Sequence, residues 1–127
     1  MDTIEERIEQ FLGLIVQADR VFEVRVPNFR DRAASTYTHT CSGYFRADAI
    51  KAAAQAIAAL DRFPTTPAVY LTLNPVNPSL LARSADHIKP KAKETTQDDD
   101  ILRRYWLLID VDPQRPRGVS STDRELA

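Results

Sequence analysis

Two carboxylates, Asp110 and Asp112, stand one residue apart at the end of the apolar run Trp106–Ile109. In a β-strand, residues two apart project from the same face, so these side chains are expected to lie close together. Bare carboxylates repel each other at short range, and hard cations such as Mg²⁺ or Mn²⁺ relieve that repulsion by binding both. The spacing therefore predicts one half of a metal site. An alternative is that one aspartate faces solvent while Asp112, which precedes Pro113, caps a turn.

Cationic residues on both sides of these carboxylates could contact phosphate. Two pairs of arginines flank the predicted metal site, and their alternative role is to neutralise the acidic run Asp98–Asp100. Three lysines alternate around Pro90, in a polar stretch that is also typical of a solvated loop. These candidates for nucleotide or nucleic-acid binding are Arg103, Arg104, Arg115, Arg117, Lys89, Lys91 and Lys93.

Aromatic side chains can stack on bases only where they are exposed. Tyr70 and Trp106 lie inside predicted strands, so we expect them to be core residues. Tyr37 and Tyr44 are expected to be more exposed and are the better stacking candidates, although no motif supports them.

The elements that must position these residues are predicted from periodicity and capping. Thr3 and Glu6 have the spacing of a capping box, and Asp48 is a plausible N-cap for a second, alanine-rich helix. The pattern predicts helices over about 3–18 and 48–60, strands over 21–26, 40–45, 69–73 and 105–111, a short helix over 79–84, and a mobile polar loop over 85–97. This order favours an α+β fold in which helices flank a mixed sheet.

Bulk composition limits the possible classes of protein. The chain has 127 residues, a net charge of −1 and a pI near 6.1, so it has the size of one domain and its overall charge gives no support for nucleic-acid binding. The single cysteine cannot form an internal disulfide, which favours a reducing cytoplasm. No apolar run is long enough to span a membrane, and the N-terminus lacks a signal-peptide pattern, so no membrane partner is expected.

Several motifs accompany the two aspartates. They are the run Val69–Val76, Leu80–Arg83, Thr95–Thr96 with Asp98 and Asp100–Ile101, the run Arg103–Pro113, and Arg115–Pro116 with Gly118 and Ser120–Asp123. Together they resemble the N-terminal part of phage- and plasmid-type DNA primase-polymerases of the archaeo-eukaryotic primase superfamily, over about positions 40–127.

The resemblance implies a function. In that superfamily the first catalytic motif is a hydrophobic strand that ends in Asp-x-Asp, which Asp110 and Asp112 match. The implied activity is nucleotidyl transfer with two metal ions, Mg²⁺ or Mn²⁺, acting on nucleoside triphosphates and a DNA template with its primer. A helicase domain or partner is a further possibility.

The chain also departs from the family pattern. The second motif, Ser-x-His, and a further metal-binding Asp lie downstream of the first motif, and only 15 residues follow Asp112. His39 and His87 precede the motif and cannot be matched to it. We therefore expect residues 1–127 to be the N-terminal part of a primase-polymerase catalytic domain, incomplete just after its first catalytic strand and inactive alone although its parent is an enzyme. The alternative is a non-catalytic module, derived from such an enzyme, that binds nucleic acid or a replication partner.

Overall fold

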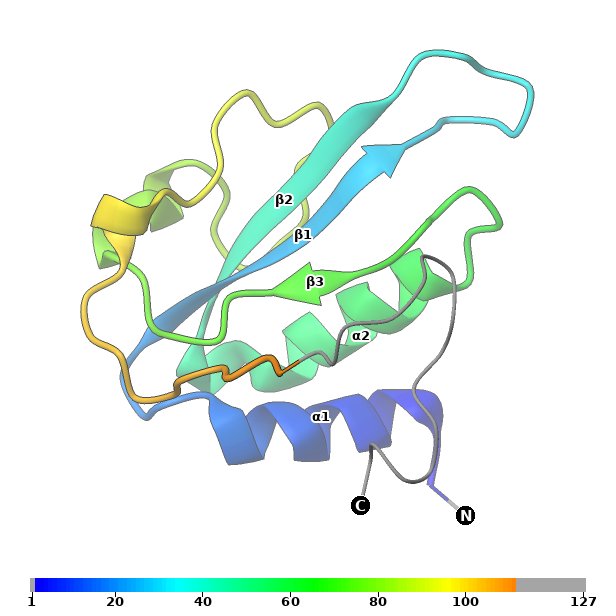
Figure 1. Cartoon of the computed structure of the whole chain (residues 1–127). Helices are drawn as coiled ribbons and strands as arrows, with labels where there is room; N and C mark the ends of the chain where they lie inside the picture. The colour runs from blue at the N-terminus through cyan, green and yellow to red at the C-terminus, as the bar shows by residue number, and fades with distance from the viewer. Residues whose placement is uncertain (1, 112–127) are drawn as a thin grey trace.

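The computed structural model describes residues 2–111, and the statements below concern that part of the chain. Its elements are α1 (Ile4–Ile15), β1 (Val21–Phe29), β2 (His39–Arg46), the 3₁₀ turn η1 (Ala47–Ala49), α2 (Ile50–Asp61), β3 (Tyr70–Leu71), and the 3₁₀ turns η2 (Pro78–Ala82) and η3 (Asp98–Asp100). The strands form a sheet of order β2-β1-β3, and α1 and α2 pack side by side on one of its faces (Figure 1). The α+β class is confirmed.

The prediction of a mixed sheet is wrong for the described strands. β1 pairs antiparallel with both β2 and β3. The antiparallel β1–β2 pair follows from a connection of only nine residues between Phe29 and His39, because parallel neighbours need a crossover of a dozen or more residues. A parallel contact occurs in one isolated bridge between Tyr44 and Ala85.

Local capping explains where α1 begins. The Thr3 hydroxyl accepts a hydrogen bond from the Glu6 amide at 3.2 Å, and the Glu6 carboxylate accepts one from the Thr3 amide at 2.8 Å. This reciprocal pair satisfies amides that have no partner within the helix. The helix ends at Ile15, three residues earlier than predicted, and buries Leu12 against the sheet.

Alternation along β1 and β2 separates two faces of the sheet. Phe22, Val24 and Phe45 point toward the helices and form the main core with Leu12 and the small face of α2. The predicted Asp48 cap is wrong, since that residue lies in η1 and α2 begins at Ile50 without a side-chain cap. The helix is held instead by burial of its alanine-rich face.

The other face of the sheet is covered by the segment 75–101, which contains η2 and η3. Val21, Tyr44, Val76 and Leu80 form a second buried cluster there. The predicted short helix over 79–84 is the 3₁₀ turn η2, which begins one residue earlier. The segment therefore forms a layer on the face of the sheet opposite the helices.

β3 is shorter and more exposed than its apolar sequence suggests. The predicted strand 69–73, expected to be covered on both faces, is reduced to Tyr70–Leu71 at the edge of the sheet. The Tyr70 side chain is therefore exposed rather than part of the core.

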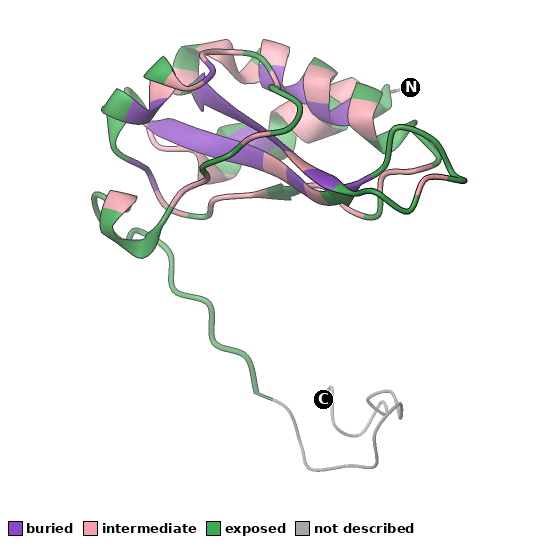
Figure 2. Ribbon diagram, turned by 90° about the horizontal axis from the view of Figure 1, so that it is seen from above, coloured by how far each residue is buried: buried purple, intermediate pink, exposed green. Residues whose placement is uncertain are grey.

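The predicted strand 105–111 is not formed. Residues 106–111 are extended, with no regular secondary structure, and Figure 2 shows this stretch leaving the body as an exposed trace. A strand requires a neighbouring backbone for its N–H and C=O groups, whereas here the Asn74 side chain accepts hydrogen bonds from the Tyr105 and Trp106 amides, each at 2.8 Å. No helix of the described residues is long and apolar enough to cross a membrane.

Candidate phosphate-binding cavity and metal half-site

The predicted metal half-site is described only in part. Asp110 is exposed on the extended stretch after Trp106, and Asp112 lies outside the described residues. Within residues 2–111, no group of three or more His, Cys, Asp or Glu side chains could together hold a metal ion. The described structure therefore leaves the Asp110–Asp112 pairing a prediction.

The flanking arginines are only partly described as well. Arg103 and Arg104 are exposed, and the Arg103 guanidinium lies 6.0 Å from the centre of the Tyr105 ring. Neither forms an ion pair with Asp98–Asp100 in the described part of the chain, so the neutralising role considered above is not seen there. Arg115 and Arg117 lie outside the described residues.

The three lysines, in contrast, are brought to one place. They line a cavity of about 420 Å³ beside β2, together with an arginine from the end of η2. We call this feature the cationic cavity, and its polar lining residues are Ser42, Tyr44, Arg83, Ser84, Lys89, Lys91, Lys93 and Glu94.

The segment that carries these lysines is held against β2 by backbone hydrogen bonds. These hydrogen bonds do not support the prediction that the segment is a mobile loop. The Ser42 amide donates to the Lys89 carbonyl at 3.0 Å, and the Lys89 amide donates to the Ser42 carbonyl at 2.8 Å. Lys91 has a φ of 54°, a left-handed conformation that turns the chain after Pro90. Because of this bend, the lysines converge on one cavity and do not simply alternate along an extended strand.

His39 has a structural role in the same region. Its side chain is buried, its Nδ1 accepts a hydrogen bond from the Lys91 amide at 3.2 Å, and its Nε2 lies 2.9 Å from an Asp31 carboxylate oxygen. This histidine therefore helps to hold the turn at Lys91. His87 is exposed and contacts the Ala85 carbonyl through Nδ1 at 2.8 Å.

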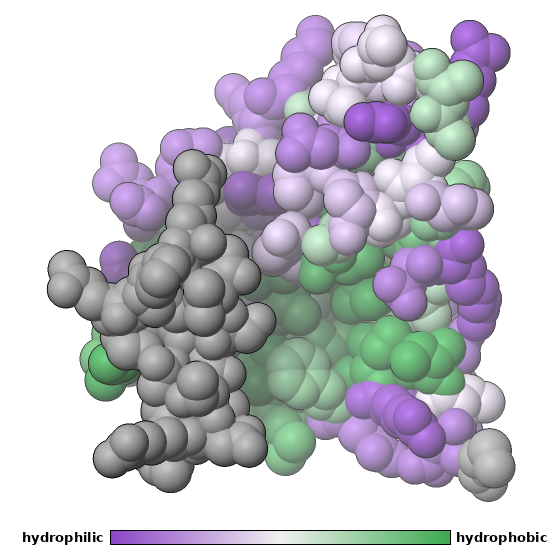
Figure 3. Space-filling view, turned by 45° about the vertical axis from the view of Figure 1, so that its right-hand side comes forward, coloured by the Kyte–Doolittle hydropathy of each residue, from purple (hydrophilic) through white to green (hydrophobic). Residues whose placement is uncertain are grey.

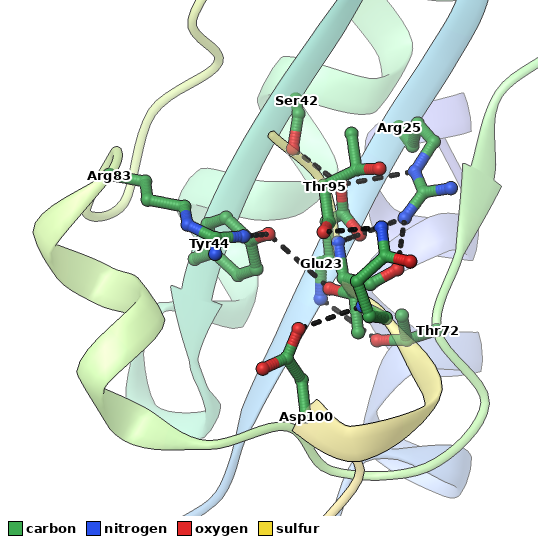
Figure 4. Close-up of polar contacts among 10 residues, drawn as sticks. Glu23, Arg25, Ser42, Tyr44, Thr72, Arg83, Thr95 and Asp100 are labelled. Atoms are coloured by element: carbon green, nitrogen blue, oxygen red, sulfur yellow. Dashed lines mark hydrogen bonds and ion pairs between the residues drawn. The ribbon is translucent and has the colours of Figure 1, made fainter. Parts of the chain in front are cut away.

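A buried carboxylate lies behind the cavity wall. The side chain of Glu23 is fully buried, and its oxygens accept hydrogen bonds from Arg25 at 2.6 Å, the Ser42 hydroxyl at 2.5 Å and the Thr96 amide at 3.2 Å (Figure 4). Burial by itself raises the pKa of this carboxyl, but the hydrogen bonds and the charge of Arg25 together hold the pKa below its ordinary value. Glu23 thus joins β1 and β2 to the segment 75–101.

Tyr44 connects this network to the cationic cavity. Its hydroxyl accepts hydrogen bonds from Arg83 at 3.2 Å and from the Thr96 hydroxyl at 3.3 Å, and Figure 4 shows Arg83 and Tyr44 pointing toward each other. The expectation that Tyr44 is exposed and free to stack is wrong, since only 1% of it is accessible. Tyr37 is exposed, as expected, whereas Trp106 is 42% exposed and not a core residue.

Sequence reasoning missed both Glu23 and Arg83 as members of this site. Glu23 occupies the polar position of an alternating strand, which usually marks a solvent-facing residue. The only local signal was that Arg25, two residues later, projects from the same face and could pair with it. The burial itself depends on Thr96, 73 positions away along the chain.

The cavity favours a multivalent anion. Four cationic side chains face one carboxylate, Glu94, whose oxygen lies 3.5 Å from an Arg83 nitrogen. This excess of three positive charges stands out in a chain whose net charge is −1. A surface lined by one sign of charge concentrates ligands of the opposite sign.

Comparison with protein-family models, with curated proteins and with solved structures found no similar protein. The likeness to primase-polymerases therefore rests on the sequence motifs alone.

Proposed function

We propose that this chain is part of the catalytic domain of a DNA primase-polymerase, in which Asp110 and Asp112 hold divalent metal ions for nucleotidyl transfer. The motifs around the two aspartates support the proposal. The structural observation that carries it is the exposure of the apolar stretch that leads to them. Leu107, Leu108, Ile109 and Val111 are between 74% and 81% exposed.

Exposing these apolar side chains to water costs free energy. Burying one side chain of this kind stabilises a protein by about 1.5–3 kcal/mol, so covering all four corresponds to roughly 6–12 kcal/mol. Further apolar side chains gather in the hollowed middle of one face of the molecule, with hydrophilic side chains above and below them (Figure 3). The apolar stretch thus has a strong tendency to enter a sheet or to pack against another layer.

Strand formation would bring the chemistry together. Leu107, Ile109 and Val111 would then share one face, while Leu108, Asp110 and Asp112 would share the other. The first face would pack and the second would present both carboxylates. Ions bound there would neutralise the charge that develops on the triphosphate during transfer to the primer 3′-hydroxyl.

The metal role is tested in the chain as it stands. Mn²⁺ is titrated into the ¹⁵N-labelled protein while paramagnetic broadening of amide signals is followed. Two carboxylates supply only part of an octahedral shell, so we expect a Kd of about millimolar or weaker, with Mn²⁺ bound more tightly than Mg²⁺. Broadening centred on Asp110 that disappears in Asp110→Asn, but persists in the control Asp99→Asn, supports the proposal. Broadening centred on Asp98–Asp100 would show that the ion binds this acidic run and would contradict the proposed site at Asp110 and Asp112.

The catalytic role is tested in the longest open reading frame that contains this sequence. We expect primer extension with Mg²⁺ or Mn²⁺, and a loss of at least about tenfold in Asp110→Asn and in Asp112→Asn, because a metal ion contributes several kcal/mol to transition-state stabilisation. The control Asp99→Asn should keep its activity. Aspartate variants that retain more than about a tenth of the activity would rule out the assigned role.

A non-catalytic module that binds nucleic acid or a replication partner is the second candidate function. The observation that favours it is the cationic cavity, whose described lining residues lie between positions 42 and 94 and do not include Asp110. An open frame that stops at codon 127, together with nucleic-acid binding but no primer extension, would establish this alternative. An open frame that continues through Ser-x-His and a later Asp would favour the enzyme.

A further inference from the structure

We propose that the cationic cavity is a binding site for phosphate groups, either those of a nucleotide or those of a nucleic-acid backbone. The site lies at the outer edge of β2, and Asp110 is not among its described lining residues. Its position and its cationic lining are taken from the structure and do not depend on the proposed function. Only the source of the phosphate rests on the proposed function.

The cavity presents two different kinds of cation. Lys89, Lys91 and Lys93 are exposed, so their ammonium groups can reach a ligand without leaving buried partners unpaired. Within the described residues, none of these lysines forms an ion pair with a carboxylate. Arg83 is more enclosed and is oriented by the Tyr44 hydroxyl. Its planar guanidinium can donate to two phosphate oxygens at once, whereas the lysines act as mobile point charges.

The cavity is held in place before any ligand binds. β2 lines the cavity with Ser42 and Tyr44, and Ser42 is hydrogen-bonded through its backbone to Lys89. Behind β2, Thr96 connects the Tyr44 hydroxyl to the Glu23 carboxylate. A preorganised site loses less conformational freedom on binding than a flexible polar loop would. This is the physical difference between the cavity and a solvated run of lysines.

The volume is compatible with a small charged group. About 420 Å³ lies within the usual range of ligand pockets, and the hydroxyls of Ser42 and Ser84 are already engaged with Glu23 and with the His87 carbonyl. The cations therefore supply the free donors. A ligand with several negative oxygens fits this lining better than a neutral sugar or an apolar group.

The experiment uses the whole chain in EDTA, so that the carboxylate half-site makes no contribution through a metal. Pyrophosphate is titrated into the ¹⁵N-labelled protein, and a fluorescently labelled single-stranded oligothymidylate is titrated in an anisotropy assay at several salt concentrations. The double variant Lys91→Asn, Lys93→Gln removes two exposed cations, and Asn is tolerated at the left-handed position 91. The control Arg7→Gln, Lys51→Gln removes the same charge from exposed positions on α1 and α2.

We expect pyrophosphate to shift the amide signals of residues 42–44 and 83–94, and the double variant to weaken its binding by roughly tenfold while the control changes it little. If the phosphate comes from nucleic acid, the oligonucleotide competes with pyrophosphate, and the double variant lowers the magnitude of the salt slope by about 1.4. If it comes from a nucleotide, pyrophosphate binds and the oligonucleotide does not compete. Equal weakening in the two double variants, or no shift in the cavity signals, would overturn the proposal without affecting the metal test.

Discussion

Gly43 lies in β2, where the strand passes close to the segment 84–93 that carries the three lysines. A single methyl group added at this position should push that segment away from the sheet. A Cβ added there would lie 2.1 Å from the His87 carbonyl oxygen and 3.0 Å from the Ile88 Cα. Both are backbone atoms, so they cannot move aside as the end of a flexible side chain could. Gly43→Ala therefore requires β2 and the segment 84–89 to move apart.

The cost follows from the hydrogen bonds that flank this contact. Ser42 exchanges two backbone hydrogen bonds with Lys89, while Tyr44 accepts one from Asp86 and donates one to Ser84, over distances of 2.7–3.0 Å. Each contributes about 1 kcal/mol net, so losing most of the four should lower the free energy of unfolding by about 2–4 kcal/mol.

Urea unfolding followed by circular dichroism measures this loss, and hydrogen exchange locates it, because the Asp86 and Lys89 amides should lose protection first. Gly13→Ala is the matched control. Gly13 lies in α1 with no atom within 4 Å of an added Cβ, so alanine there should stabilise the protein by about 0.5–1 kcal/mol. A Gly43→Ala protein within about 0.5 kcal/mol of the original chain would refute the argument.

Two further predictions concern the network behind the cavity. Tyr44→Phe removes the acceptor shared by Arg83 and Thr96, so we expect a loss of about 1–2 kcal/mol in stability and weaker pyrophosphate binding; unchanged binding would show that Arg83 needs no support from Tyr44. The lowered pKa of Glu23 means that its contribution to stability is present above the pKa of the unfolded state and is lost as the pH falls through the lower, folded pKa. Unfolding measured from pH 7 downward should therefore show a shallower acid dependence in Glu23→Gln than in the original chain, and identical slopes would contradict the assignment.

Local signals in the sequence determined much of the helix-and-hairpin unit. Thr3 and Glu6 cap α1 within a single turn, and the alternation through Phe22, Val24 and Val26 identifies β1. The strand nevertheless continues past Pro27, which local rules treat as a boundary, because a register irregularity between Val26 and Phe29 accommodates it. Patterns of this kind are readable because the interacting groups lie within a few residues of one another.

The apolar run before Asp110 shows the limit of such patterns. Its composition suits a strand, but a strand also needs a partner backbone, and in the described part of the chain this stretch meets the Asn74 side chain instead. Sequence alone identified Asp110 and Asp112 as candidate metal ligands. Their arrangement depends on contacts that composition does not encode.

The cationic cavity was decided by tertiary structure. The sequence by itself identified Lys89, Lys91 and Lys93 as possible phosphate ligands, but it gave no reason to place them beside Arg83 and Tyr44 or to bury Glu23 behind them. Those positions follow from hydrogen bonds between β2 and residues more than 35 positions later in the chain. Local sequence specifies which side chains are available and which way a strand or helix turns them, whereas only long-range packing decides which of them share one cavity.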